Sequence, residues 1–218
     1  MSDALRRLAD LWGLALPPHV TAALLLIVLF ELQAYVRFGA TARRVRGGAS
    51  DGGSTRVLML AYLVVIFGFL LTIRTPTMSR IIAVPNWFVW PGPTPVMVRV
   101  AWAGVALGLG GLCLRLWAVL TLRHRYTRTL LIDDDGHTLE RRGPYRVVRH
   151  PGYLGSVLCF TGFALASASL FVVALSVAAT LAAYAYRIAA EDRMLMAQFG
   201  AAYAQYRREV AALLPFVW

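Results

Sequence analysis

A run of 36 residues without a charged side chain, from Pro151 to Tyr186, constrains the fold of this chain more than any other feature. As a single α-helix the run would be roughly 54 Å long, whereas the hydrocarbon core of a bilayer is about 30 Å thick. One membrane crossing cannot use this length, but a tight helical hairpin can. A second uncharged run lies between Arg56 and Arg74. We therefore expect a chain that crosses a membrane several times.

Charged residues are scarce and gather at the ends of the apolar runs. They make up 15% of the chain, against about 25% in a typical soluble domain. All 22 basic residues are Arg, and the net charge is +11. Nucleic-acid binders concentrate such charge on one soluble face, whereas arginines at the ends of apolar runs favour membrane topology and contact with anionic headgroups. The expected partner is a membrane, and no nucleic acid is expected.

The apolar pattern predicts an all-α integral membrane protein with about five transmembrane helices. The expected spans are 19–37, 57–74, 97–122, 151–167 and 170–188. The last two form a C-terminal hairpin. Beyond it, apolar side chains recur at helical spacing and predict a cytoplasmic amphipathic tail helix, which either covers a pocket or coats the bilayer. We divide the chain into N-terminal helices with a proline-rich segment (1–100) and a C-terminal core (101–218).

The distribution of arginine predicts the orientation in the membrane. The first and third loops and the tail together carry 16 arginines, against 5 on the other side. By the positive-inside rule the N-terminus lies outside and the C-terminus lies in the cytoplasm. An Ala-rich chain whose basic residues are all Arg is typical of a high-GC prokaryote, so we expect an inner or plasma membrane.

Two charged residues, Glu31 and Arg115, fall inside expected spans. A charge at membrane depth usually has a partner or a purpose, although a residue near the interface can instead extend its side chain to the surface. Both interpretations stay open for each residue. In the third span, Gly104 and Gly108 form a G-x-x-x-G pattern, which is typical of close helix packing in membranes.

The stretch "RRGPYRVVRHPGYLG" lies where the charge-free run begins. Pro151 suits the first turn of a helix, where its missing N–H has no cost. Gly152 and Gly155 leave that turn open, and the unpaired amides of a helix start favour an electron-rich ligand. With Arg149 and His150 just before it, the stretch predicts a polar pocket at the cytoplasmic mouth of the hairpin. The alternative is a basic cap that anchors the hairpin at the headgroups.

A second polar pair leaves the hairpin at its other end. Arg187 and Glu191 are four residues apart and share one face of a helix. The simpler interpretation is a local ion pair, which contributes only a few tenths of a kcal/mol when exposed. However, an antiparallel hairpin brings this exit and the segment around His150 to the same membrane surface. We therefore expect the two polar groups to be neighbours.

These elements together resemble the isoprenylcysteine carboxyl methyltransferase family, within a wider group that includes phospholipid N-methyltransferases. The resemblance is carried by "GHTLERRGPYRVVRHPGYLG", followed by Glu191–Asp192, "FGAAYAQY" and "LPF". It covers about residues 115–218 and several motifs in order.

The resemblance implies an integral membrane enzyme that uses S-adenosylmethionine and takes a lipid-tailed acceptor from the bilayer. Arg149 and Arg187 would flank the reacting groups and, with Glu191, are the candidate catalytic residues. Asp192 departs from the family's usual acidic pair, which leaves its role open. The residues that would line the cofactor site are Tyr145, His150, Tyr153, Leu154, Gly155 and Glu191. No metal is expected, because the histidines outside the motif are scattered along the chain.

The identity of the acceptor decides whether a base is required. A carboxylate needs alignment and exclusion of water, whereas a phenol or an amine needs a base, for which His150 or Glu191 would be the candidates. We expect carboxyl O-methylation of a prenylcysteine-like substrate. The alternatives are methylation of a phospholipid amine or a phenolic lipid hydroxyl, and a non-catalytic membrane scaffold, against which the intact motif argues.

Overall fold

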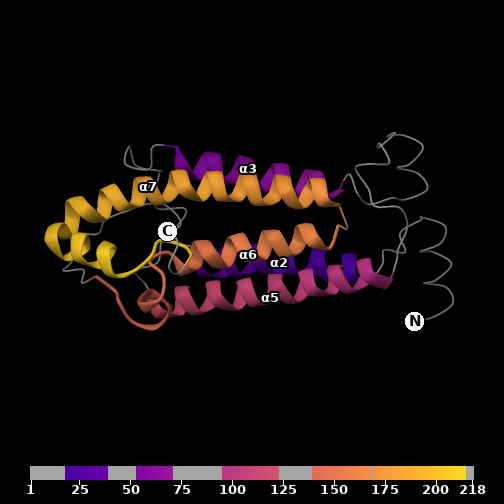
Figure 1. Cartoon of the computed structure of the whole chain (residues 1–218), viewed down its shortest axis with the longest axis horizontal. Coiled ribbons are helices and arrows are strands. Elements are labelled where there is room, and N and C mark those ends of the chain that lie inside the picture. The colour runs from indigo at the N-terminus through magenta and orange to yellow at the C-terminus, as the bar shows by residue number, and fades with distance from the viewer. Residues whose placement is uncertain (1–17, 39–52, 71–94, 123–138, 168, 215–218) are drawn as a thin grey trace.

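The computed structural model describes residues 18–38, 53–70, 95–122, 139–167 and 169–214. These residues form an all-helical bundle (Figure 1). In chain order the elements are α2 (Pro18–Phe38), α3 (Ser54–Leu70), α5 (Pro95–Leu122), the short 3₁₀-helix η3 (Gly143–Arg146), α6 (Pro151–Leu165) and α7 (Leu170–Glu209). In the described ranges the sole β-pairing is an isolated parallel bridge between Val148 and Ala211.

The first four expected spans coincide with α2, α3, α5 and α6 to within a few residues. The last one differs, because α7 does not end near residue 188 but continues to Glu209. The segment from 189 to 199 holds no proline or glycine that would end a helix. The turn comes at Gly200, whose φ of 51° is one that side-chain-bearing residues rarely adopt. The expected tail helix is thus the same helix, redirected at one glycine.

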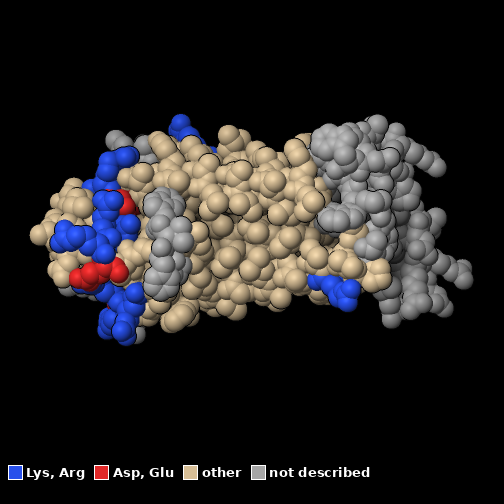
Figure 2. All heavy atoms as spheres, in the orientation of Figure 1, with Lys and Arg blue, Asp and Glu red and all other residues tan. Residues whose placement is uncertain are grey.

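The outer surface of the bundle suits a bilayer. Helices α5 and α7 are long and apolar enough to cross a membrane, and α2, α3 and α6 contain shorter apolar helices. Large apolar side chains are exposed along their outer faces, among them Leu25, Leu29, Leu60, Leu63, Phe67, Leu109, Leu116 and Leu181. On the face shown in Figure 2 the middle of the bundle is uncharged, and most charged side chains lie at the end where α7 bends. A count of five crossings stays a prediction.

Helices α5 and α6 approach each other through glycines, as the G-x-x-x-G pattern predicted. A Cβ on Gly111 would lie 2.5 Å from the carbonyl oxygen of Gly155, and one on Gly155 would lie 2.6 Å from the carbonyl oxygen of Gly111. Gly104 and Gly108 lie in the same interface, against α6. The two backbones are therefore in direct contact, which fixes the depth at which the first turn of α6 lies beside α5.

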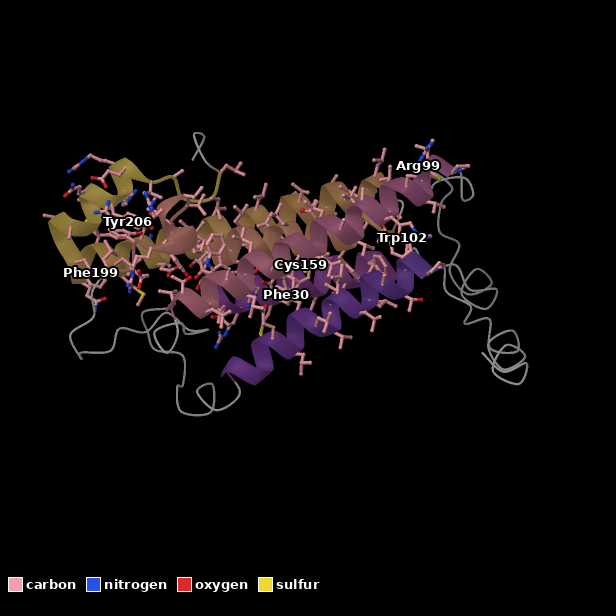
Figure 3. The ribbon with its side chains drawn as sticks, turned by 90° about the horizontal axis from the view of Figure 1, so that it is seen from below. Phe30, Arg99, Trp102, Cys159, Phe199 and Tyr206 are labelled. Carbon is pink, nitrogen blue, oxygen red and sulfur yellow. The ribbon has the colours of Figure 1, made fainter. Side chains whose placement is uncertain are left out.

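The middle of the bundle contains an aromatic core and one buried cation. Phe30 and Cys159 lie there, between Tyr206 at one end and Arg99 at the other (Figure 3). Arg115 is 6% exposed and donates to the Ser156 hydroxyl at 2.6 Å. Its guanidinium lies over the Phe30 ring, 4.4 Å from the centroid. Of the two interpretations of this charge, the buried and partnered one is correct; the Glu31 side chain lies outside the described part of the structure.

The division of the chain near residue 100 stays a prediction. Helix α5 begins at Pro95, so the proposed boundary falls in its first turns.

Candidate active site

The segment before α6 is held by backbone pairing with the C-terminal residues. The N–H of Arg149 donates to the carbonyl of Ala211 at 2.8 Å, and the N–H of His150 donates to that of Ala212 at 3.0 Å. Pro151 occupies the first turn of α6, as its sequence position predicted. The chain therefore enters α6 beside residues that follow the turn at Gly200, and both lie at the charged end of the bundle.

His150 lies between the carboxylates of two consecutive residues of α7. Its Nδ1 is 3.3 Å from Oε2 of Glu191, and its Nε2 is 3.2 Å from Oδ1 of Asp192. The imidazole is 4% exposed, and Tyr153 lies parallel to it with the ring centroids 5.4 Å apart. The two polar groups that the sequence placed at opposite ends of the hairpin are thus in contact, as predicted.

This arrangement favours a protonated imidazole and two ionised acids. Burial by itself would lower the pKa of His150, but the two carboxylates outweigh it and raise that pKa above its ordinary value. Burial would raise the pKa of Asp192, but His150, Tyr203 and Arg149 hold it well below its usual range. The pKa of Glu191 is likewise lowered, despite burial, chiefly by His150.

Arg149 is engaged by protein groups on several sides. Its Nη1 donates to both oxygens of Asp192, at 3.1 and 3.0 Å, and to the Tyr203 hydroxyl at 3.3 Å. Its Nε donates to the carbonyl of Val210 at 3.0 Å. In this structure Arg149 ties the segment before α6 to the C-terminal residues. Its expected place beside the reacting groups stays a prediction.

Arg187 connects the site to the start of α3. It is 3% exposed, and its Nε donates to the Tyr153 hydroxyl at 2.9 Å. Its Nη1 lies 3.2 Å from the hydroxyl oxygens of both Ser54 and Thr55. Tyr153 therefore has His150 on one side and Arg187 on another, so the two candidate groups of the hairpin meet at this side chain.

The other residues expected at the cofactor site take different positions. Tyr145 is buried, and its carbonyl accepts a hydrogen bond from the Tyr206 hydroxyl at 2.6 Å. Leu154 packs with Tyr153 against a small apolar cluster of Ile188, Ala212 and Leu213. Gly155 faces α5, where a side chain would meet backbone, so its evident role is helix packing.

Sequence reasoning left two contributions unassigned, Asp192 and the hydroxyls of Ser54 and Thr55. For the C-terminal residues it offered two positions, over a pocket or along the bilayer. The spacing of Tyr203 and Tyr206 in "FGAAYAQY" indicated one helical face, and that face is the one that turns inward. No sequence pattern marked the hydroxyls of Ser54 and Thr55, because only the packing of α3 against α7 brings them to Arg187.

The residues present fit S-adenosylmethionine. Glu191 Oε2 is buried and faces His150 Nδ1 at 3.3 Å, a charge contact without regular hydrogen-bond alignment, so the oxygen keeps acceptor capacity. A buried carboxylate oxygen of this kind is an acceptor for an ammonium group or a ribose hydroxyl. Tyr153 and Leu154 add an apolar wall beside it.

Comparison with known proteins agrees with this geometry. The family model for phospholipid methyltransferase matches residues 100–202, which include His150, Glu191 and Asp192. A probable protein-S-isoprenylcysteine O-methyltransferase of Oryza sativa subsp. indica is 32% identical over 122 residues, which are 54% of this chain and 62% of that protein. A methanethiol S-methyltransferase 2 of Bradyrhizobium diazoefficiens is 28% identical over 158 residues, covering 63% of this chain and 56% of that protein.

The fold is also that of a solved structure, the eukaryotic intramembrane Ras methyltransferase ICMT, with a TM-score of 0.62 at 20% identity. The match covers 94% of this chain and 70% of that one. These matches confirm the predicted resemblance: over its C-terminal half the chain is similar to isoprenylcysteine carboxyl methyltransferases, within the wider phospholipid methyltransferase group. It spans about three fifths of the length of the rice relative.

Proposed function

We propose that this chain is an S-adenosylmethionine-dependent membrane methyltransferase whose acceptor is the carboxylate of a prenylcysteine-like lipid. The observation that carries the proposal is the position of His150 between Glu191 and Asp192, next to Tyr153 and Arg187. All of these except Asp192 match the family's motif, and they lie at the charged end of an apolar bundle.

The cofactor, when bound, supplies a methyl group on a sulfonium that is already an activated leaving group. Transfer to a carboxylate breaks the carbon–sulfur bond, leaves that electron pair on sulfur and forms a carbon–oxygen bond without any proton transfer. Glu191 holds a polar group of the cofactor, and the apolar wall of Tyr153 and Leu154 excludes water. Arg187, buried beside Tyr153, orients the acceptor carboxylate by a charge-assisted hydrogen bond.

The electrostatics of the site favour a carboxylate over a phenol or an amine. A protonated acceptor needs a base with a pKa near the working pH. The raised pKa of His150 favours its charged form, and the lowered pKa values of Glu191 and Asp192 make them weak bases. A nucleophile that is already anionic requires none of them. The protein substrates in the names of the eukaryotic relatives and the methanethiol in the name of the bacterial one show that acceptors differ across the group.

We also propose the orientation that the arginine distribution predicts, with the site and the C-terminus in the cytoplasm and the N-terminus outside. A prokaryotic inner or plasma membrane is the proposed location. Reporter fusions at the two ends of the chain test this proposal, and a cytoplasmic signal from both ends contradicts it.

The test of the reaction is incubation of detergent-purified protein with radiolabelled S-adenosylmethionine and matched acceptors. A prenylcysteine with a free carboxylate is compared with its carboxamide twin, a phospholipid amine and a phenolic lipid. We expect label in the free carboxylate alone, released by mild alkali as a methyl ester is. Alkali-stable label in the amine or the phenol would overturn the carboxylate assignment, and no label in any acceptor or in extracted lipids would overturn the methyltransferase proposal.

A further inference from the structure

Asp192 is the point at which three separate pieces of the site meet. Its Oδ1 faces His150 Nε2 and accepts a hydrogen bond from the Tyr203 hydroxyl. Both of its oxygens accept from Arg149, and Arg207 Nε lies 3.5 Å from Oδ2. The side chain is 11% exposed. The donors come from the segment before α6 and from the part of α7 that follows Gly200.

These contacts hold the C-terminal residues against the expected cofactor wall. Arg149, bound to Asp192, also donates to the carbonyl of Val210. Two residues later the chain reaches Ala212 and Leu213, each 1% exposed, which pack with Ile188 against Tyr153 and Leu154. The C-terminal residues therefore pack against the expected cofactor wall, and Arg149 links them to Asp192.

We propose that Asp192 is a positioning residue for the proposed methyl transfer: it holds the His150 ring in place opposite Glu191 and, through Arg149 and Tyr203, fixes the C-terminal residues over Tyr153 and Leu154. This inference rests on the proposed function. It assigns a role to the residue at which this chain departs from the family's usual acidic pair.

The geometry explains why the charge of Asp192 matters beyond its shape. An imidazole donates from both ring nitrogens only when it is protonated. Around His150 lie Glu191 and Asp192 on α7, Tyr153 on α6 and Arg149 beside it in the chain. Without the Asp192 charge, His150 loses one of its two anionic partners and its pKa falls. Glu191 is then left beside a neutral ring, and Arg149 loses the anchor that places it.

The first experiment measures affinity for S-adenosylhomocysteine as a function of pH in the wild type, Asp192→Asn and Asp192→Glu, with Glu209→Gln as the matched control on the same helix. We expect Asp192→Asn to bind about ten- to a hundredfold more weakly near neutral pH. The pH at which binding is lost on the alkaline side should fall by about one pH unit in Asp192→Asn. Asp192→Glu should restore part of the affinity and part of this shift in pH. Glu209→Gln should match the wild type. An unchanged pH midpoint in Asp192→Asn overturns the proposal, even if the variant is less stable.

The second experiment needs no variant at Asp192. Replacing His19, His124 and His137 by Gln leaves His150 as the sole histidine of the chain. Nitrogen-15 spectra of this protein at pH 7.5 should show a doubly protonated imidazole; a neutral ring overturns the proposal. Wild-type protein that binds no cofactor would contradict the proposed function instead, so the two failures are distinguishable.

Discussion

Helix α6 is held in two different ways along its length. In its middle it touches α5 through glycine backbones, with no polar side chain needed at Gly111, Gly155 or Gly162. At its first turn it is held by charged side chains that converge on Asp192 and His150. Apolar contact gains stability at no desolvation cost, whereas buried charges cost free energy unless every one is paired. The difference indicates that the glycine interface maintains the fold, and it supports the proposal that the charged end serves the reaction.

The largest expected effect comes from breaking the glycine interface. In Gly111→Val the new side chain meets the backbone of α6, which cannot move aside, so we expect destabilisation by about 3 kcal/mol or more. Gly110→Val is a matched control, because nothing lies within 4 Å of a Cβ there. Thermal unfolding in detergent compares the two. Equal melting temperatures would show that the helices are not in backbone contact.

Removing the carboxylate of Glu191 should weaken cofactor binding at the charged end and leave the fold intact. Glu191→Ala removes a charge-assisted contact to the cofactor worth roughly 1.5–3 kcal/mol, so affinity should fall about ten- to a hundredfold. Calorimetric titration with S-adenosylhomocysteine measures this. The control is Glu209→Gln, at an exposed ion pair with Arg141, which should bind normally. If Glu191→Ala bound the cofactor product as tightly as the wild type, Glu191 would not be a cofactor-binding residue.

Replacing Arg187 should change the rate more than the affinity for the cofactor. A group that orients the acceptor is felt mainly in the transition state, so Arg187→Ala should lower the single-turnover rate at least about tenfold with a smaller loss of cofactor binding. Arg193→Ala, at an exposed position on the same helix, is the control. Equal losses of rate and affinity would indicate that Arg187 acts by holding Tyr153 and α3.

The smallest effect expected is a pH dependence of stability from the charged end. Folding raises the pKa of His150. Its contribution to the free energy of unfolding is therefore complete below about pH 6.5 and is lost as pH rises through the folded-state pKa. Folding lowers the pKa values of Glu191 and Asp192, so the pH dependence has the opposite sign. Their contribution to the free energy of unfolding is present above about pH 4 and is lost as pH falls through the folded-state pKa values. Melting curves should show the alkaline loss in the wild type and in His19→Gln, and not in His150→Gln. An alkaline loss that persists in His150→Gln would assign it to another group.

Sequence patterns predicted the helices and the meeting of the hairpin ends because both follow from local chemistry. Charge-free runs set the helix lengths, and antiparallel connection puts residues near His150 and Glu191 on one side. Asp192 was not assigned, because consecutive residues on a helix point about 100° apart and only the fold shows that His150 meets both carboxylates. The helix itself runs on past the expected end of the last span, since residues 189–199 hold no proline or glycine that would stop it. The point at which it leaves the bilayer stays a prediction.

The roles of glycine show the same limit. Gly155 was expected to open the first turn of α6 to a ligand, yet its missing side chain admits the backbone of α5. Both uses require a residue without a Cβ, so the sequence cannot separate them. Packing against the partner helix decides between them.

The central claim is that the charged end of the bundle is a site for S-adenosylmethionine. Its most direct test is titration of the detergent-solubilised wild-type chain with S-adenosylmethionine and S-adenosylhomocysteine, by calorimetry and by thermal shift. We predict saturable binding close to one ligand per chain and a rise in melting temperature with ligand concentration. Absence of both heat and thermal shift with either ligand would contradict the claim.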